Sequence, residues 1–120
     1  MNSEVVVELT KLAERDLKAL WKISSEVIEH LKILRNNPEK GHPLSGSLQG
    51  ARSLEFSLKG SGQYRAVYVY IIKDSNVTVF MVGPHENFYK QAQKRAGLVK
   101  DLITQAREEQ AKKPQKKKRQ

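Results

Sequence analysis

The sequence predicts an α+β domain in the order β-α-α-β-β-β-α, with a mostly antiparallel four-stranded sheet, a helical hairpin and a C-terminal helix. Two consecutive stretches near the N-terminus repeat apolar residues at helical spacing, and a third such stretch lies near the C-terminus. Between them, three short apolar stretches are separated by turn residues, as in antiparallel strands. Such a sheet can pack helices on one face and leave the other solvated. We therefore expect one layer of helices on one sheet.

The N-terminal third accounts for the first strand and the helical hairpin. Residues 5–9 are rich in valine, which favours a strand. Thr10 can cap the helix that follows, and Ser24 and Ser25 can cap a second one. The expected apolar face of the first helix consists of Ala13, Leu17, Leu20 and Trp21. That of the second helix consists of Val27, Ile28, Leu31 and Leu34. Pro38 forces the residue before it out of helical geometry, so the second helix ends there.

A glycine- and proline-rich loop is expected over residues 38–51, and strands follow it. Residues 53–59 alternate between apolar and polar side chains, which is typical of a strand with one buried face. Residues 64–72 are apolar on both faces, which suits a central strand. A turn at 73–76 leads to another strand at 77–82.

The last expected element is a helix over residues 88–109. Its apolar positions are Phe88, Ala92, Ala96, Val99 and Ile103. Gly97 weakens the middle of this helix because glycine is a poor helix former.

Length and composition bound the class of protein. At 120 residues, of which 38% are hydrophobic, the chain fits one domain with a modest core. The absence of cysteine excludes disulfides, thiolate metal sites and cysteine nucleophiles. No apolar run approaches the roughly 20 residues that a membrane-spanning helix needs. The first residues lack the basic region of a signal peptide, so we expect a cytoplasmic protein with no membrane partner.

Positive charge is concentrated at the C-terminus. Residues 112–120, KKPQKKKRQ, hold six of the 22 basic residues and none of the 13 acidic ones. This segment therefore supplies +6 of the net charge of +9. It cannot bury apolar surface, so we expect residues 1–111 to form the domain and residues 112–120 a disordered tail. The tail can attract RNA or a ribosomal surface through screened electrostatics, or serve only to keep the chain soluble.

The candidate functional site lies between Gln63 and Tyr89. Arg65 begins one strand, and His85 and Tyr89 follow the next strand at the expected entrance of the last helix. A guanidinium that binds phosphate, an imidazole that exchanges protons near neutral pH and a phenol can thus meet at one end of the sheet. The positive end of a helix also favours an anion there. This combination suits cleavage of a phosphodiester without a metal.

Each of these residues also has a purely structural interpretation. His85 can be a helix cap or a surface residue, Arg65 can pair with Glu55 across the hairpin, and Tyr89 can be half-buried core. The other two histidines are weaker candidates. His30 falls beside core positions of the second helix, and His42 lies in the polar loop, from which it can close over the site.

No cofactor is expected from the sequence. The sequence shows no His, Asp and Glu cluster with metal-ligand spacing. It also contains no phosphate-binding glycine loop, no dinucleotide fingerprint and no Ser-His-Asp arrangement. We therefore expect neither a metal nor a nucleotide cofactor.

Three motifs resemble the RelE/ParE superfamily of bacterial type II toxin–antitoxin toxins. They are NPEKGHPLSGSLQGARSLEF, GQYRAVYVY and VFMVGPHENFYKQAQKR, and the resemblance spans about residues 5–96. It implies a compact microbial-RNase-like fold and a cognate antitoxin as partner. In RelE-like members, the toxin is an endoribonuclease that cuts mRNA in the ribosomal A site without a metal.

The resemblance also implies roles for individual residues. Arg65 matches the arginine of the "YR-VY" strand motif, His85 the basic residue after the last strand, and Tyr89 the aromatic that follows; these three are the expected catalytic residues. The expected RNA-binding residues are Arg52, Lys59, Lys90, Lys94 and Arg95. The chain departs from the best-known RelE toxins at Glu55 and Ser57, where those toxins place lysines. Glu55 then either assists proton transfer or marks a different cleft.

Three functions follow from the resemblance. The first is a ribosome-dependent endoribonuclease toxin, which His85 and Tyr89 favour. The second is a ParE-type inhibitor of DNA gyrase, which shares the fold and lacks a nuclease site. The third is a toxin-like domain that is no longer toxic and acts as an interaction module.

Overall fold

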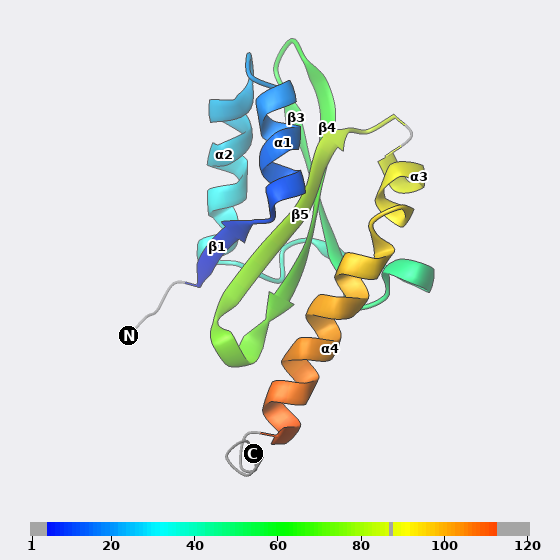
Figure 1. Ribbon diagram of the computed structural model, residues 1–120. Coiled ribbons are helices and arrows are strands. Elements are labelled where there is room, and N and C mark those ends of the chain that lie inside the picture. The colour runs from blue at the N-terminus through cyan, green and yellow to red at the C-terminus, as the bar shows by residue number, and fades with distance from the viewer. Residues whose placement is uncertain (1–4, 87, 113–120) are drawn as a thin grey trace.

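The computed structural model describes residues 5–86 and 88–112 of the chain. Its centre is a five-stranded sheet with the strand order β1-β5-β4-β3-β2 (Figure 1). The strands are β1 (Val6–Leu9), β2 (His42–Pro43), β3 (Arg52–Leu58), β4 (Gly62–Ile71) and β5 (Asn76–Pro84). β1 runs parallel to β5, and the other neighbouring pairs are antiparallel. The α+β class, the mostly antiparallel sheet and the four expected strands are confirmed.

β2 is a fifth strand that the sequence did not predict. It is two residues long, lies within the expected loop, and pairs with β3 so that His42 faces Ser53. The chain before it is anchored by Tyr68, whose hydroxyl donates to the Pro38 carbonyl at 2.7 Å and accepts from the Gly41 N–H at 2.9 Å. A Cβ on Gly41 would lie 2.8 Å from the Ser53 carbonyl oxygen, so only glycine fits at this crossing. These long-range contacts convert part of the loop into an edge strand.

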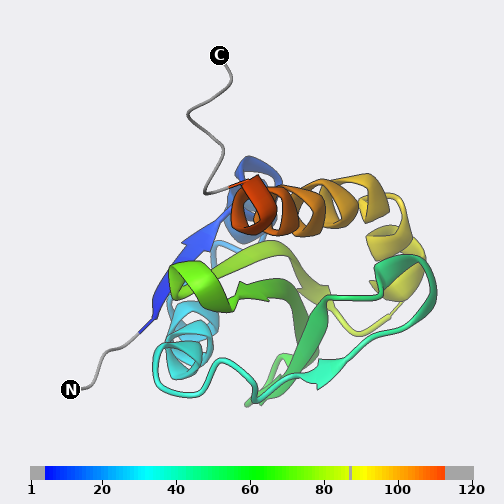
Figure 2. The same cartoon turned by 90° about the horizontal axis from the view of Figure 1, so that it is seen from below.

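Helices cover both faces of the sheet, and the expectation that one face can stay solvated was wrong. Helices α1 (Lys11–Ala19) and α2 (Ser24–Lys32) pack with one core, whereas α3 (Phe88–Gln93) and α4 (Ala96–Lys112) pack with the other (Figures 1 and 2). The first core includes Ala13, Val27, Leu31, Leu54, Ala66 and Val79. The second includes Leu48, Val67, Val69, Phe80, Phe88 and Val99. A central strand that is apolar on both faces requires such cover, because each face must be removed from water.

One of the two predicted helix caps is present. The Thr10 hydroxyl oxygen accepts a hydrogen bond from the Ala13 N–H at 3.1 Å and caps α1, as predicted. Ser24 and Ser25 do not cap α2, because they are its first two helical residues. Ile23 occupies the cap position and offers no side-chain hydrogen bond.

The expected apolar faces of α1 and α2 are correct except at Trp21 and Ile28. Leu17 and Leu20 pack against the first core. Trp21, which was expected on the same face, lies beyond the end of α1 and is 71% exposed. Ile28 on α2 is also exposed. None of the helices in the described ranges is both long and apolar enough to cross a membrane.

The C-terminal helix is divided into α3 and α4 at Lys94 and Arg95, before Gly97 rather than at it. The Arg95 N–H donates to the Ala92 carbonyl at 2.8 Å in the turn that separates the two helices. α4 runs to Lys112, the last described residue, so the rest of the predicted tail lies outside the described residues.

Side chains replace a strand along the outer edge of β5. β1 pairs only with residues 76–79 of β5. Beyond them, the Asp16 carboxylate of α1 accepts from the Val82 N–H at 3.0 Å, and Arg95 donates to the Phe80 carbonyl at 2.7 Å. Arg95 also binds Asp16 through two hydrogen bonds of 2.8 and 3.0 Å. This pair satisfies backbone groups at a bulge in β5, where the register with β4 shifts.

Candidate functional site

The candidate site is built on one row of the sheet. Glu55 on β3 lies directly opposite Arg65 on β4, and Arg65 lies opposite Gly83 on β5. His85 follows at once, and its N–H donates to the Gln63 carbonyl at 2.9 Å, which extends the ladder past the end of β5. The His85 carbonyl then accepts from the Phe88 N–H at 3.2 Å as α3 begins. The backbone of His85 is therefore held on both sides.

Arg65 is the centre of the site and contacts Glu55, His85 and Tyr89. Its Nε and Nη2 atoms lie 2.9 and 2.8 Å from Nδ1 of His85. Its Nη1 donates to the Tyr89 hydroxyl at 2.7 Å and forms an ion pair with Glu55. The guanidinium carbon also lies 5.0 Å from the centre of the Tyr89 ring, within cation–π range. The predicted convergence of Arg65, His85 and Tyr89 and the alternative pairing with Glu55 are both present.

These contacts define the hydrogen-bonding state of His85. Guanidinium groups only donate hydrogen bonds, so Nδ1 of His85 must accept. In the neutral imidazole the proton is then assigned to Nε2. The His85 side chain is exposed, so this N–H is available to a ligand.

A second histidine joins the row from the other side. Nε2 of His42 lies 3.4 Å from the Glu55 carboxylate, which therefore lies between His42 and Arg65. This contact depends on β2, which places His42 beside β3. The sequence suggested only that His42 can close over the site, because two residues are too few to show strand alternation.

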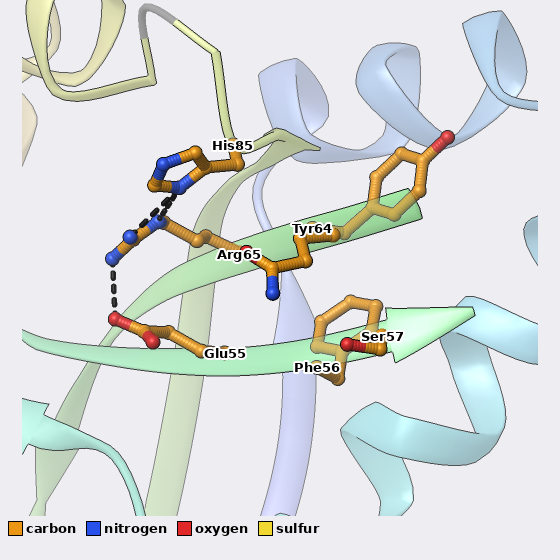
Figure 3. Close-up of a pocket in the computed structure, with 7 residues that line it drawn as sticks. Glu55, Phe56, Ser57, Tyr64, Arg65 and His85 are labelled. Carbon is orange, nitrogen blue, oxygen red and sulfur yellow. Dashed lines mark hydrogen bonds and ion pairs between the residues drawn. The ribbon is translucent and has the colours of Figure 1, made fainter. Parts of the chain in front are cut away.

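An open pocket of about 240 Å³ adjoins the row (Figure 3). It is lined by Glu55, Phe56, Ser57, Gln63, Tyr64, Arg65 and His85. Arg65 and His85 share this pocket, as the sequence predicted. Tyr89 does not line it, although it contacts Arg65 at the same end of the sheet. Its hydroxyl lies 3.4 Å from Ser53 Oγ, and its ring contacts Phe88 edge-on.

The chain matches the family model described as the ParE-like toxin of type II bacterial toxin–antitoxin systems over residues 5–93. It belongs to this family of toxins. No curated protein matches the chain significantly.

Solved structures of RelE proteins are similar to this toxin. In the toxin–antitoxin complex RelBE2 from Mycobacterium tuberculosis, the similar chain is 26% identical, with a TM-score of 0.60. That match covers 71% of this chain and 95% of the other. A mutant of the E. coli toxin RelE in the free state is 25% identical, with a TM-score of 0.59 and coverage of 77% and 97%. The resemblance to the RelE/ParE superfamily is thereby confirmed.

The five basic residues expected to bind RNA fall into two groups in the toxin. Lys59, Lys90 and Lys94 have exposed side chains. Arg52 instead donates to the Gly41 carbonyl at 2.6 Å, and Arg95 binds Asp16 and the edge of β5. The structure thus gives both arginines a role in holding the fold together, which the sequence did not indicate.

Within the described ranges, no three histidine, aspartate or glutamate side chains lie close enough to hold a metal ion.

Proposed function

We propose that this toxin is a metal-independent endoribonuclease that cleaves mRNA in the ribosomal A site and is neutralised by a cognate antitoxin. The observation that supports the nuclease most strongly is the contact of Arg65 with both Glu55 and His85 at one open pocket. Cleavage through the 2′-hydroxyl needs a positive charge at the phosphate, a proton acceptor and a proton donor, and these groups can supply all three. The antitoxin is proposed because the similar RelBE2 structure is a toxin–antitoxin complex.

In the free toxin these groups form hydrogen bonds and an ion pair with one another. A bound substrate can replace these contacts with contacts to its phosphate. A phosphodiester that accepts the donors of Arg65 releases the Glu55 carboxylate and Nδ1 of His85 from the guanidinium. Glu55 can then accept the proton of the 2′-hydroxyl. Nδ1 of His85 becomes free to bind a proton, so the imidazolium can donate one to the leaving 5′-oxygen.

The 2′-oxygen forms a bond to phosphorus as its proton passes to Glu55, and the bond from phosphorus to the 5′-oxygen breaks as His85 protonates that oxygen. The products are a 2′,3′-cyclic phosphate and a 5′-hydroxyl. Arg65 stabilises the charge that develops on the phosphorane, and Tyr89 positions Arg65 through its hydroxyl and its ring.

The first prediction concerns Arg65→Ala in a translation reaction with purified ribosomes and a defined mRNA. We expect cleavage, measured from mapped 5′ ends, to fall by about 10²–10³-fold, as when a single transition-state donor is removed. Arg15→Ala, at an exposed position of α1, is the matched control and should cleave like the parent. Equal cleavage by a folded Arg65→Ala protein would refute the proposed site.

Inhibition of DNA gyrase is the second candidate, because the matching family model is described as ParE-like. The same purified proteins should be added to a gyrase supercoiling reaction. Loss of supercoiling by parent and Arg65→Ala alike, with intact mRNA in the first assay, would favour the gyrase inhibitor. A chain that arrests neither growth nor either reaction would be a non-toxic interaction module.

A further inference from the structure

Two polar side chains of the pocket are left out of the network around Arg65. Ser57 and Gln63 both line the pocket and face each other in the β3–β4 register, next to the pair formed by Glu55 and Arg65. Both residues are exposed. Within the described part of the chain, neither side chain forms a hydrogen bond, whereas Glu55, Arg65 and His85 all bind one another or their neighbours.

We propose that Gln63, assisted by Ser57, is a subsite that reads the nucleobase attached to the scissile phosphate. This inference rests on the proposed nuclease function, since Arg65 and His85 define where the phosphate lies. Side chains two residues apart on a strand share a face, so residues 55 and 57 of β3 and residues 63 and 65 of β4 form one polar surface. Along β4, Gln63 lies about 7 Å from Arg65, a distance suited to one nucleotide.

The backbone supports such a subsite. The Gln63 carbonyl accepts the His85 N–H at 2.9 Å, so the base-reading residue and the proposed acid are fixed to each other. The hairpin that joins β3 to β4 is closed by a 2.9 Å hydrogen bond from the Ser61 N–H to the Leu58 carbonyl. Gly62 has a φ of +95°, which allows the chain to enter β4 directly before Gln63. A short, closed hairpin holds the backbone of Gln63 beside the pocket that its side chain lines.

The chemistry of the side chains indicates the base. A glutamine amide presents one acceptor and one donor in a plane, which match the N6 amino group and N7 of adenine. The Ser57 hydroxyl can donate or accept beside it. Bases of single-stranded RNA are commonly read at such edges. We therefore expect a preference for adenine at this position.

The test uses the full chain and four 2′-O-methyl RNA trimers that differ only in the central base. Methylation blocks the attacking oxygen, so binding is measured without cleavage. The parent should bind the adenine trimer about fivefold more tightly than the others, the lower end of the range for a bidentate contact. Gln63→Ala should abolish this preference, and Gln49→Ala, at an exposed loop position, should keep it. Thermal unfolding of each variant verifies that it is folded.

A parallel measurement separates this inference from the nuclease proposal. The 5′ ends of ribosome-bound mRNA are mapped for the parent and Gln63→Ala, and the base at the cut is scored. Cleavage with a base profile unchanged by Gln63→Ala would overturn the subsite and leave the nuclease standing. An adenine preference in binding, without any cleavage by the parent, would support the base-binding subsite and overturn the nuclease proposal. Equal binding of all four trimers, or binding of none, would also overturn the subsite.

Discussion

In the part of the toxin that the structure describes, two carboxylate–guanidinium pairs lie near β5, and they differ in what else they bind. Asp16 and Arg95 bind the Val82 N–H and the Phe80 carbonyl, so this pair completes the backbone hydrogen bonding of an unpaired strand edge. Within the described residues, Glu55 and Arg65 bind each other and otherwise only the side chains of His85, Tyr89 and His42. The first pair therefore serves the fold, and the second remains available for ligand.

Solvent exposure supports this division. Asp16 and Arg95 expose 17% and 21% of their side chains. Arg65 exposes 13%, but its partner Glu55 exposes 47% and lines the pocket. Loss of Asp16 or Arg95 leaves backbone groups without hydrogen-bond partners. If Arg65 is removed, by contrast, the half-exposed Glu55 carboxylate can be hydrated. Removal of a charged side chain should therefore reduce stability at the pair of Asp16 and Arg95 and reduce activity at the pair of Glu55 and Arg65.

Among variants of the two ion pairs, Asp16→Ala has the largest expected effect on stability. It leaves the Val82 N–H and the Arg95 guanidinium without their partner. We expect a loss of about 2–3 kcal/mol in the free energy of unfolding, less than for a fully buried pair because water reaches this one. Urea unfolding measures this loss. Arg65→Ala should change the same quantity by at most about 1 kcal/mol, because its carboxylate partner is half exposed.

The assignment of one ion pair to stability and the other to activity is wrong if Asp16→Ala loses cleavage and Arg65→Ala loses stability. Cleavage per folded molecule should stay near the parent level in Asp16→Ala. A strong loss of cleavage in folded Asp16→Ala, with little loss of stability, would show that the edge of β5 takes part in function.

The next effect concerns Tyr68, which holds the loop that places His42 beside Glu55. Tyr68→Phe leaves the buried Gly41 N–H without its acceptor and the Pro38 carbonyl without its donor. This should lower the free energy of unfolding by about 1–2 kcal/mol. Tyr70→Phe is the matched control, because Tyr70 is only partly buried and its hydroxyl forms no hydrogen bond within the described ranges.

Tyr68 should also make the free energy of unfolding depend on pH in the alkaline range. Burial raises the pKa of Tyr68 above its ordinary value, while the Gly41 hydrogen bond and the Arg52 charge act in the opposite direction. The folded state therefore favours the neutral phenol, and its contribution to stability is complete below about pH 10. This contribution is lost as the pH rises through the higher folded-state value. Unfolding curves should converge for parent and Tyr68→Phe above pH 10, and a constant difference would contradict this.

The sequence predicted most of the fold because periodicity is a local signal. The alternation in β3 and the two-sided apolar pattern of β4 gave both strands and their central place. That pattern in β4 also implies that both faces of the sheet are covered. The expectation that one face can stay solvated therefore conflicted with a signal that the sequence contains. β2 and the pair of Asp16 and Arg95 left no such signal, since they depend on contacts between distant segments.

The candidate site shows the same division. Arg65 and His85 were predicted because each lies at the end of a recognisable strand, and Glu55 was named as a partner because it lies in the neighbouring strand. The contact of His42 with Glu55 requires β2, and whether Tyr89 lines the pocket depends on the exact start of α3. Strand register is thus predictable here, and the packing of loops and helix ends is not.

The smallest expected effect is that of Trp21→Ala, which tests whether exposure or residue type determines the contribution of a large apolar side chain. Trp21 lies just beyond the end of α1, is 71% exposed, and has the Lys22 ammonium 5.5 Å from its ring centre. Its removal should change the free energy of unfolding by less than about 0.5 kcal/mol, as at other surface positions. Leu34→Ala, at a fully buried position, should cost about 2–5 kcal/mol in the same urea experiment. A cost for Trp21→Ala near that of Leu34→Ala would mean that the tryptophan packs against the helical hairpin in solution, and the first core would then extend beyond α1.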